Sequence, residues 1–246
     1  MDPDRGPHPG LLPGDPVAIG PVRLTGRLGS GGMSTVFVGE LAGHGEVAVK
    51  VIAPHLSGDE EYRRRLRREV DALRRVDSPR VAPLIDADVD GDDPWLALGF
   101  LDGPTLRARV VDQGALPSRR VSEVADQLAE GLVALHLVGV VHRDLTPANV
   151  ILTDRGAVIV DLGIARLGGG APLTRTGTTV GTPAWMAPEQ LTGAPVGPPA
   201  DVFAWGGVVT YAATGRAPFG EGDPAALGYR IVHTVPELAG VADDLA

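Results

Sequence analysis

The stretch VVHRDLTPANVIL, residues 140–152, places His142, Arg143 and Asp144 inside an otherwise aliphatic run. Burying a charged side chain costs free energy unless the charge is paired or used. A fold that buries this run must therefore give the three polar side chains partners or a task. Any single aspartate of this kind could also be an ordinary turn residue, so the surrounding sequence has to decide.

Short apolar runs of strand type precede this stretch. They lie at 22–28, 34–40, 46–52, 81–89 and 95–100, and several are rich in β-branched residues. One helix is predicted between them, starting near Ser57, which stands at capping-box spacing from Glu60. Its apolar residues recur at helical intervals. They are Tyr62, Leu66, Val70 and Leu73.

Helical patterns dominate after residue 102. The segment VSEVADQLAEGLVAL gathers its apolar residues on one face. These are Val121, Val124, Leu128, Leu132 and Leu135. We therefore expect an α+β fold of two lobes, with a β-rich N-lobe at 17–101 that contains one long helix, and a mainly helical C-lobe at 102–246. Residues 1–16 are rich in proline and glycine and are expected to be disordered.

Composition narrows the class of protein. The 246 residues carry a net charge of −9 and no cysteine. The acidic balance argues against nucleic-acid binding, and the lack of cysteine excludes disulfides and thiolate metal sites. The N-terminal sequence MDPDRGPHPG has no apolar run of the secretory type, and the longest apolar stretch, VFAWGGVVTYAA, is too short to span a bilayer. We expect a soluble cytoplasmic protein with no membrane segment in this chain.

The segment LGSGGMSTVF contains three glycines, Gly29, Gly31 and Gly32, between two predicted strands. Glycine lets the backbone approach a polyanion closely, with its N–H groups directed at the anion. A dinucleotide-binding turn would open a helix, whereas β-branched residues follow here, which favours a strand–turn–strand flap over phosphates. By itself the segment fits a plain hairpin turn equally well.

Two charged residues of the first half can likewise be read either as ordinary structural residues or as functional ones. Lys50 ends the predicted strand EVAVK and could be a solvent-exposed lysine. Glu69 lies on the apolar stripe of its helix, where a carboxylate needs a partner, and Lys50 is the economical candidate. The arginines nearby, at 63–65, 67 and 68, are best explained as a solvated helix face.

Downstream of Asp144, two further oxygen ligands follow in order, Asn149 and then Asp161 in the sequence DLG. An amide and a carboxylate suit Mg²⁺, which binds few protein ligands together with phosphate oxygens. Asp144 could accept a proton from an attacking hydroxyl. A glycine flap, a strand lysine, a helix glutamate, HRD-x₄-N and D-x-G in this order are together highly specific.

This series resembles the eukaryotic-type Ser/Thr protein kinases of bacteria, in particular of actinobacteria. The resemblance extends from about Val17 to the C-terminus and rests on VAVK, RREV, HRDLTPANV, DLGIAR, GTPAWMAPEQ and DVFAWG. It implies transfer of the ATP γ-phosphoryl group to protein Ser/Thr hydroxyls, with Mg²⁺ or alternatively Mn²⁺ as the metal. It also implies autophosphorylation of the activation loop, for which a homodimer would serve.

The resemblance assigns roles residue by residue. The implied catalytic residues are Lys50, Glu69, Asp144, Asn149 and Asp161, of which Asn149 and Asp161 would hold the metal. The implied nucleotide contacts are Leu28, Gly29, Ser30, Gly31, Gly32, Met33, Ser34, Thr35, Val36, Ala48, Lys50, Leu98, Gly99, Leu101 and Ile151. The implied hydrophobic spine is Leu73, Leu84, His142 and Leu162, and Asp201 would anchor the catalytic loop. Thr174 and Thr176 are the preferred phosphorylation sites, and Thr182 favours Ser/Thr over Tyr as acceptor.

The chain departs from the family pattern in three places and leaves a second function open. Ser34 replaces a flap glycine, Leu162 the usual Phe of DFG, and Thr146 the lysine of HRDLKPAN. The family's C-lobe normally continues for several helical turns past the position of Ala246 and carries an arginine that pairs with Glu189. A longer natural form could also carry a membrane anchor. The alternative to an active kinase is a nucleotide-binding pseudokinase that works as an interaction module, with a dinucleotide-dependent oxidoreductase a distant third.

Overall fold

The computed structural model describes residues 9–161 and 183–242. The chain divides into two compact units, the first made of residues 1–74 and 82–100, the second of residues 75–81 and 101–246. The polypeptide thus passes between the units after residues 74, 81 and 100. Segment 75–81, inside the range expected to form the N-lobe, belongs by its contacts to the second unit. Among the described residues, no helix is both long and apolar enough to cross a membrane.

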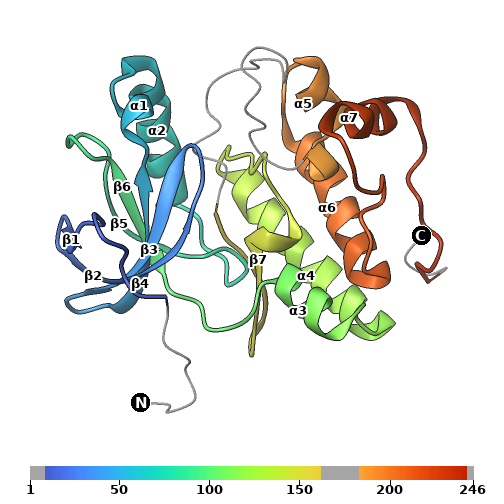
Figure 1. Cartoon of the computed structure of the whole chain (residues 1–246), viewed down its shortest axis with the longest axis horizontal. Coiled ribbons are helices and arrows are strands. Elements are labelled where there is room, and N and C mark those ends of the chain that lie inside the picture. Colours follow the sequence, from blue (N-terminus) through green and yellow to red (C-terminus); the bar gives the residue numbers. More distant parts are fainter. Residues whose placement is uncertain (1–8, 162–182, 243–246) are drawn as a thin grey trace. The chain divides into compact units, whose positions relative to one another are not determined.

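The first unit is built on an antiparallel sheet of six strands in the order β1-β2-β3-β4-β6-β5 (Figure 1). Its strands are β1 (Ala18–Ile19), β2 (Val22–Ser30), β3 (Ser34–Leu41), β4 (Gly45–Ile52), β5 (Leu84–Asp88) and β6 (Trp95–Gly99). Strand residues alternate between two faces, and one face carries a hydrophobic cluster. The cluster contains Ile19, Val22, Leu24, Phe37, Leu41, Val47, Val49, Trp95 and Ala97.

Part of the N-terminal stretch expected to be disordered packs on this unit. Leu11 contacts the hydrophobic cluster, and the Pro9 carbonyl accepts from the Arg27 N–H at 3.0 Å. The Asp15 carboxylate lies 3.0 Å from the Arg27 guanidinium and is almost fully buried. Residues 9–16 therefore extend the first unit along β2.

Two helices follow β4, namely α1 (Pro54–Ser57) and α2 (Glu60–Leu73). The predicted stripe on α2 is confirmed, since Tyr62, Leu66, Val70 and Leu73 are all buried. The predicted capping residue is wrong. Asp59 caps α2 by accepting from Glu61 N and Tyr62 N, whereas Ser57 ends α1 and its hydroxyl donates to Pro54 O.

The second unit is mainly helical, as expected. Its elements are α3 (Leu106–Gln113), α4 (Ser118–Leu137), η1 (Pro147–Asn149), β7 (Val150–Thr153), β8 (Gly156–Ile159), η3 (Pro183–Trp185), α5 (Pro188–Thr192), α6 (Pro198–Thr214) and α7 (Pro224–His233). The predicted face of α4 is buried. This helix packs against α6 and against β8 of the β7–β8 hairpin (Figure 1).

Segment 75–81 completes the second unit. Val81 forms a parallel bridge with Ile159 of β8, and the Ile159 N–H donates to Arg80 O at 2.8 Å. The Arg80 side chain binds Glu130 of α4 at 3.1 Å and the Arg155 carbonyl at 2.8 Å. This segment therefore contacts the hairpin through one isolated bridge and the Arg80 hydrogen bonds.

Candidate active site

The glycine segment forms the strand–turn–strand that the sequence favoured. Strand β2 ends at Ser30 and β3 begins at Ser34, and Gly31 N donates to Ser34 O at 2.9 Å. A Cβ added to Gly29, Gly31 or Gly32 would meet no atom within 4 Å. The three glycines are therefore not required by contacts within the fold, which agrees with a backbone kept clear for a ligand. The hairpin excludes the helix-opening turn of dinucleotide-binding proteins.

Several predicted nucleotide contacts share one face of the sheet. In the strand register, Lys50 of β4 is paired with Val36 of β3 and Leu96 of β6, and Ala48 is paired with Leu98. These residues lie on the face opposite the hydrophobic cluster, because their neighbours Phe37, Val47, Val49 and Ala97 form that cluster. Lys50 is only 6% exposed, so the expectation of a solvent-exposed lysine does not apply. An ammonium that is almost fully buried requires a nearby counter-charge.

Three further predicted positions of the first unit, Leu28, Glu69 and Gly99, are at least partly exposed. Leu28 is 41% exposed beside the hairpin. The Gly99 N–H donates to Pro83 O at 2.9 Å, so a base could use this N–H only by breaking that bond. Glu69 is half-buried on α2. Burial raises the pKa of Tyr62, on the same helix, to about 12, and the charge of Glu69 adds to that rise.

In the second unit, buried Asp201 of α6 fixes the backbone of the catalytic loop. Its Oδ2 accepts from His142 N and its Oδ1 from Arg143 N, both at 2.8 Å. Arg143 has a φ of 63°, a left-handed conformation that costs a non-glycine residue about 1–2 kcal/mol. Charge-assisted hydrogen bonds to a buried carboxylate are strong enough to hold such a conformation. Asp201 thus anchors the loop, as the resemblance implied.

The His142 ring is fully buried and both of its nitrogens are occupied. Nδ1 accepts from the Asp144 N–H at 3.2 Å, and Nε2 donates to the Val160 carbonyl at 3.2 Å. This pattern requires the neutral ring with its proton on Nε2. Burial lowers the pKa of His142 below its ordinary value of 6.5, against the opposing charges of Asp201 and Asp144. His142 therefore links the catalytic loop to the residue before Asp161.

The two predicted metal ligands are brought to one end of the β7–β8 hairpin. Val160 N donates to Asn149 O at 2.9 Å, directly beyond the last ladder pair, Val150 with Ile159. Asp161 follows with a φ of 54°, the second strained non-glycine conformation among the described residues. Strained backbone of this kind clusters at functional sites.

The donor set at this hairpin end fits Mg²⁺. The Asn149 Nδ2 donates to the Asp144 carbonyl at 2.8 Å, which leaves the amide oxygen of Asn149 as the ligand atom. With the Asp161 carboxylate it makes a pair of oxygen ligands that phosphate oxygens and water would complete. Among the described residues, no cluster of three or more His, Cys, Asp and Glu side chains could hold a metal by itself.

Two polar residues of the site were not singled out from the sequence. His136 of α4 donates from Nε2 to Asp201 Oδ2 at 2.7 Å and so supplies a second contact to the buried carboxylate. Gln190 of α5 donates from Nε2 to the Arg143 carbonyl at 2.8 Å. The two residues that each hydrogen bond joins are 65 positions apart for His136 and Asp201, and 47 positions apart for Gln190 and Arg143, so no local pattern indicates them.

A cavity of about 840 Å³ opens beside the catalytic loop. It is bounded by the loop residues Thr146, Pro147 and Ala148, by η3, and by residues of α3, α6 and α7. Trp185 and Tyr211 meet edge to face there, with ring centroids 5.6 Å apart. Burial raises the pKa of Tyr211, and the charges of Arg107 and Glu221 act on it in opposite directions. The cavity thus combines an aromatic wall with one cation and one anion.

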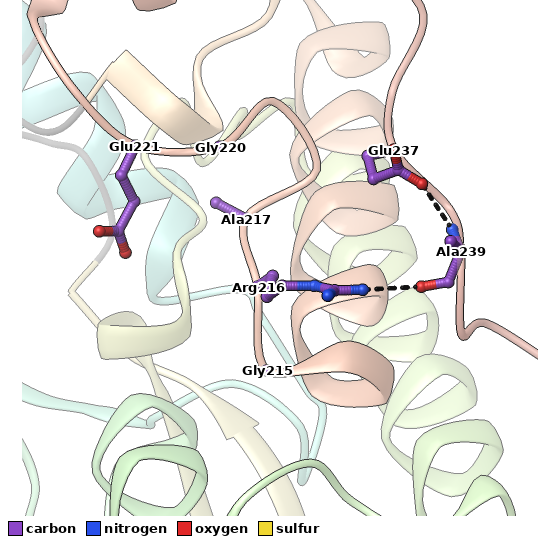
Figure 2. Close-up of a pocket in the computed structure, with 7 residues that line it drawn as sticks. All are labelled: Gly215, Arg216, Ala217, Gly220, Glu221, Glu237 and Ala239. Atoms are coloured by element: carbon purple, nitrogen blue, oxygen red, sulfur yellow. Dashed lines mark hydrogen bonds between the residues drawn. The ribbon is translucent and has the colours of Figure 1, made fainter.

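A second cavity, of about 670 Å³, lies at the C-terminal end of α6 (Figure 2). The Arg216 side chain points at Ala239 and donates to its carbonyl at 3.0 Å, and Glu237 accepts from the Ala239 N–H at 3.1 Å. Arg216 thus ties the segment after α7 to the turn after α6, while the Glu237 side-chain bond lies within that segment.

Comparison with known proteins agrees with this geometry. The family model described as "Protein kinase domain" matches residues 22–244. The chain belongs to the protein kinase family. The probable serine/threonine-protein kinase PkwA of Thermomonospora curvata is 45% identical over 96% of this chain. The serine/threonine-protein kinase AfsK of Streptomyces griseus is 39% identical over 94% of it. These alignments cover 32% and 29% of the relatives, so the chain spans about a third of their length.

A solved structure of the family supports the fold. The crystal structure of the Mycobacterium tuberculosis PknI kinase domain matches with a TM-score of 0.69 at 26% identity, covering 94% of this chain and 98% of that one. The resemblance and the expected α+β kinase fold are therefore confirmed. The predicted residues Leu162, Thr174, Thr176 and Thr182 lie outside the described residues.

Proposed function

We propose that this chain transfers the γ-phosphoryl group of ATP to serine and threonine hydroxyls of proteins. The observation that carries the proposal is the catalytic loop, where a strained and doubly anchored backbone presents Asp144 beside the hairpin end with Asn149 and Asp161. The family of the chain and the kinases among its relatives support the same activity.

In the proposed reaction, the substrate hydroxyl oxygen attacks the γ-phosphorus, and the bond from that phosphorus to the bridging β–γ oxygen breaks. Asp144 orients the hydroxyl and accepts its proton, and ADP leaves. The glycine hairpin and Lys50 would hold the phosphates, with Glu69 as the partner of Lys50. Asn149 and Asp161 would hold Mg²⁺, or Mn²⁺ in its place, which neutralises charge on the phosphates when bound.

The cavity beside Thr146–Ala148 is the proposed place for the substrate polypeptide next to the phosphoacceptor residue. Its aromatic wall would bury apolar substrate surface. The cavity is lined by Thr146, Pro147 and Ala148, which follow Asp144 closely in sequence. A peptide bound in the cavity would therefore contact the loop that carries Asp144.

The test is phosphoryl transfer from γ-labelled ATP to a generic Ser/Thr protein substrate in the presence of Mg²⁺. We expect Lys50→Met, Asp144→Asn and Asp161→Ala each to lower the rate by at least about 10²–10³-fold. Asp154→Asn is the matched control, because Asp154 is an exposed turn residue of the same hairpin. Near wild-type turnover of Asp161→Ala would contradict the metal assignment.

We also propose that the chain phosphorylates its own activation loop at Thr174 and Thr176. The guanidinium of Arg143, beside Asp144, is suited to pair with an added phosphate. Mass spectrometry after incubation with ATP and Mg²⁺ should find phosphate on these threonines. A rate per molecule that rises with protein concentration would indicate transfer within a homodimer. Phosphate found only outside 167–180 would contradict the proposal.

Thr146 favours a second candidate function, a pseudokinase that binds nucleotide and serves as an interaction module. The family carries a lysine at this position, and a threonine supplies no positive charge. Nucleotide binding does not separate the two functions, because both bind ATP. Catalytic transfer that is lost in Asp144→Asn separates them.

A further inference from the structure

The peptide group that joins Arg143 to Asp144 is held at both of its polar atoms. Its carbonyl accepts from Gln190 Nε2 at 2.8 Å, and its N–H donates to His142 Nδ1 at 3.2 Å. The plane of this peptide, together with the φ angle of Asp144, sets the direction in which the Asp144 side chain leaves the backbone. The Gln190 bond therefore restrains this peptide together with the His142 bond, while Asn149 Nδ2 holds the carbonyl on the other side of Asp144 at 2.8 Å.

The peptide needs such restraints because Arg143 is strained. With a φ of 63°, Arg143 would relax toward a right-handed conformation in the absence of fixed partners. The Asp201 carboxylate accepts from the Arg143 N–H at 2.8 Å, which holds the backbone on the N-terminal side of Arg143. The Gln190 side chain donates to the Arg143 carbonyl, which holds the backbone on the C-terminal side of Arg143.

The Gln190 amide is itself fixed. Its Oε1 accepts from Ala187 N at 2.9 Å while its Nε2 donates to Arg143 O. The reverse orientation of the amide would place its NH₂ against an N–H and its oxygen against a carbonyl, so the network permits only this one. The amide therefore transmits the position of the α5 N-terminus to the catalytic loop.

We propose that Gln190 is a positioning residue for Asp144, and that it makes the orientation of the Arg143–Asp144 peptide depend on the placement of residues 183–192. Those residues follow directly on the part of the chain that carries Thr174 and Thr176. The inference rests on the proposed kinase function, and it adds a route by which the end of the activation segment acts on the catalytic base.

Two substitutions separate the bond to Arg143 from the bond within α5. Gln190→Glu keeps an oxygen for the Ala187 N–H but has no donor for Arg143 O and places a negative charge against it. Gln190→Met removes both bonds at a similar size. Thr192→Val is the matched control, because the Thr192 hydroxyl bonds only to carbonyls of its own helix, Pro188 O and Glu189 O.

Steady-state kinetics with ATP and a peptide substrate give the first readout. We expect kcat to fall by about 10–100-fold in Gln190→Glu and in Gln190→Met, the loss expected when a catalytic group is displaced by up to about 1 Å. The KM for ATP should stay within about twofold, because no nucleotide contact is changed. Thr192→Val should behave as the wild type.

Hydrogen exchange at the Asp144 amide gives a second readout that does not depend on activity. Its exchange should be faster in both Gln190 variants than in the wild type. A wild-type kcat in Gln190→Glu, or unchanged exchange at Asp144, would overturn the inference. A loss confined to Gln190→Met would mean that only the bond to Ala187 matters, which overturns it too. If the wild type itself transferred no phosphate, the proposed function would fail while the exchange result still tested the positioning.

Discussion

His142 has no free ring nitrogen, and this makes the catalytic loop sensitive to acid. Its folded-state pKa lies below 6.5 because of burial, so the unfolded chain binds a proton that the folded chain does not. Stability from this residue is fully present above about pH 6.5 and is lost as the pH falls below it. We expect the free energy of unfolding to decrease toward pH 5.5, with at most about 1.4 kcal/mol per pH unit from this single proton.

Denaturant unfolding at several pH values measures this dependence. His142→Gln removes the titrating group and keeps a donor and an acceptor, so it should be less stable than the wild type at pH 8 but lose less on acidification. If the two proteins had parallel pH profiles, the titration would belong to other groups.

Thr146 offers a prediction on rate. A lysine here would add a cation near the transferred phosphoryl group, where the threonine can donate only a neutral hydrogen bond. We expect Thr146→Lys to raise kcat by up to about 10²–10³-fold with little change in the KM for ATP, because the cation would act mainly in the transition state. Steady-state kinetics of both proteins check this. An unchanged or lower kcat would show that another cation already fills the role.

Helices α4 and α6 contain glycines with opposite expected responses to substitution. A Cβ on Gly131 of α4 would lie 2.9 Å from Ile159 Cδ1 and 3.0 Å from Arg80 O, whereas a Cβ on Gly206 of α6 meets no described atom within 4 Å. We expect Gly131→Ala to destabilise the chain by about 1–3 kcal/mol. Gly206→Ala should stabilise it by up to about 1 kcal/mol, since alanine is the better helix former. Thermal unfolding of both variants measures the difference, and stabilisation in both would mean that helix propensity dominates.

Regular elements were predictable where one face is buried. The strand runs and the α2 and α4 stripes follow from periodicity, because burial of one face imposes a period on the sequence. The predicted cap of α2 was wrong because Ser57 and Asp59 both precede a helical turn. Which of them caps α2 depends on where the backbone leaves α1, and the sequence pattern does not show that. His136 and Gln190 could not be predicted, since their partners Asp201 and Arg143 come from other elements. The contacts of Arg80 with the second unit could not be predicted either, because its partners Glu130 and Arg155 also come from other elements.

Segment 75–81 gives a prediction for the second unit as a whole. A fragment of residues 101–246 lacks Val81, which bridges to Ile159, and Arg80, whose carbonyl accepts from the Ile159 N–H and whose guanidinium binds Glu130. Joining residues 75–81 to its N-terminus through a flexible linker should therefore raise its melting temperature by several degrees, as about 1 kcal/mol shifts a domain of this size by about 2–4 °C.

Differential scanning calorimetry of the two fragments tests this. Arg80→Ala in the linked fragment should lose part of the gain and keep the part that comes from the backbone bond of Arg80 O. Equal melting temperatures with and without the segment would mean that residues 75–81 contact this unit but do not stabilise it.

The threefold passage of the chain between the units has a consequence for synthesis on the ribosome, where the N-terminal part of a chain emerges first. All residues of the first unit have been made once Phe100 is added. Residues 75–81 have also been made by then, but Ile159, their partner, has not. The Arg80 carbonyl and Val81 therefore wait without their β8 partner during the translation of α3, α4 and the hairpin, and a nascent-chain chaperone could protect this segment until β8 arrives.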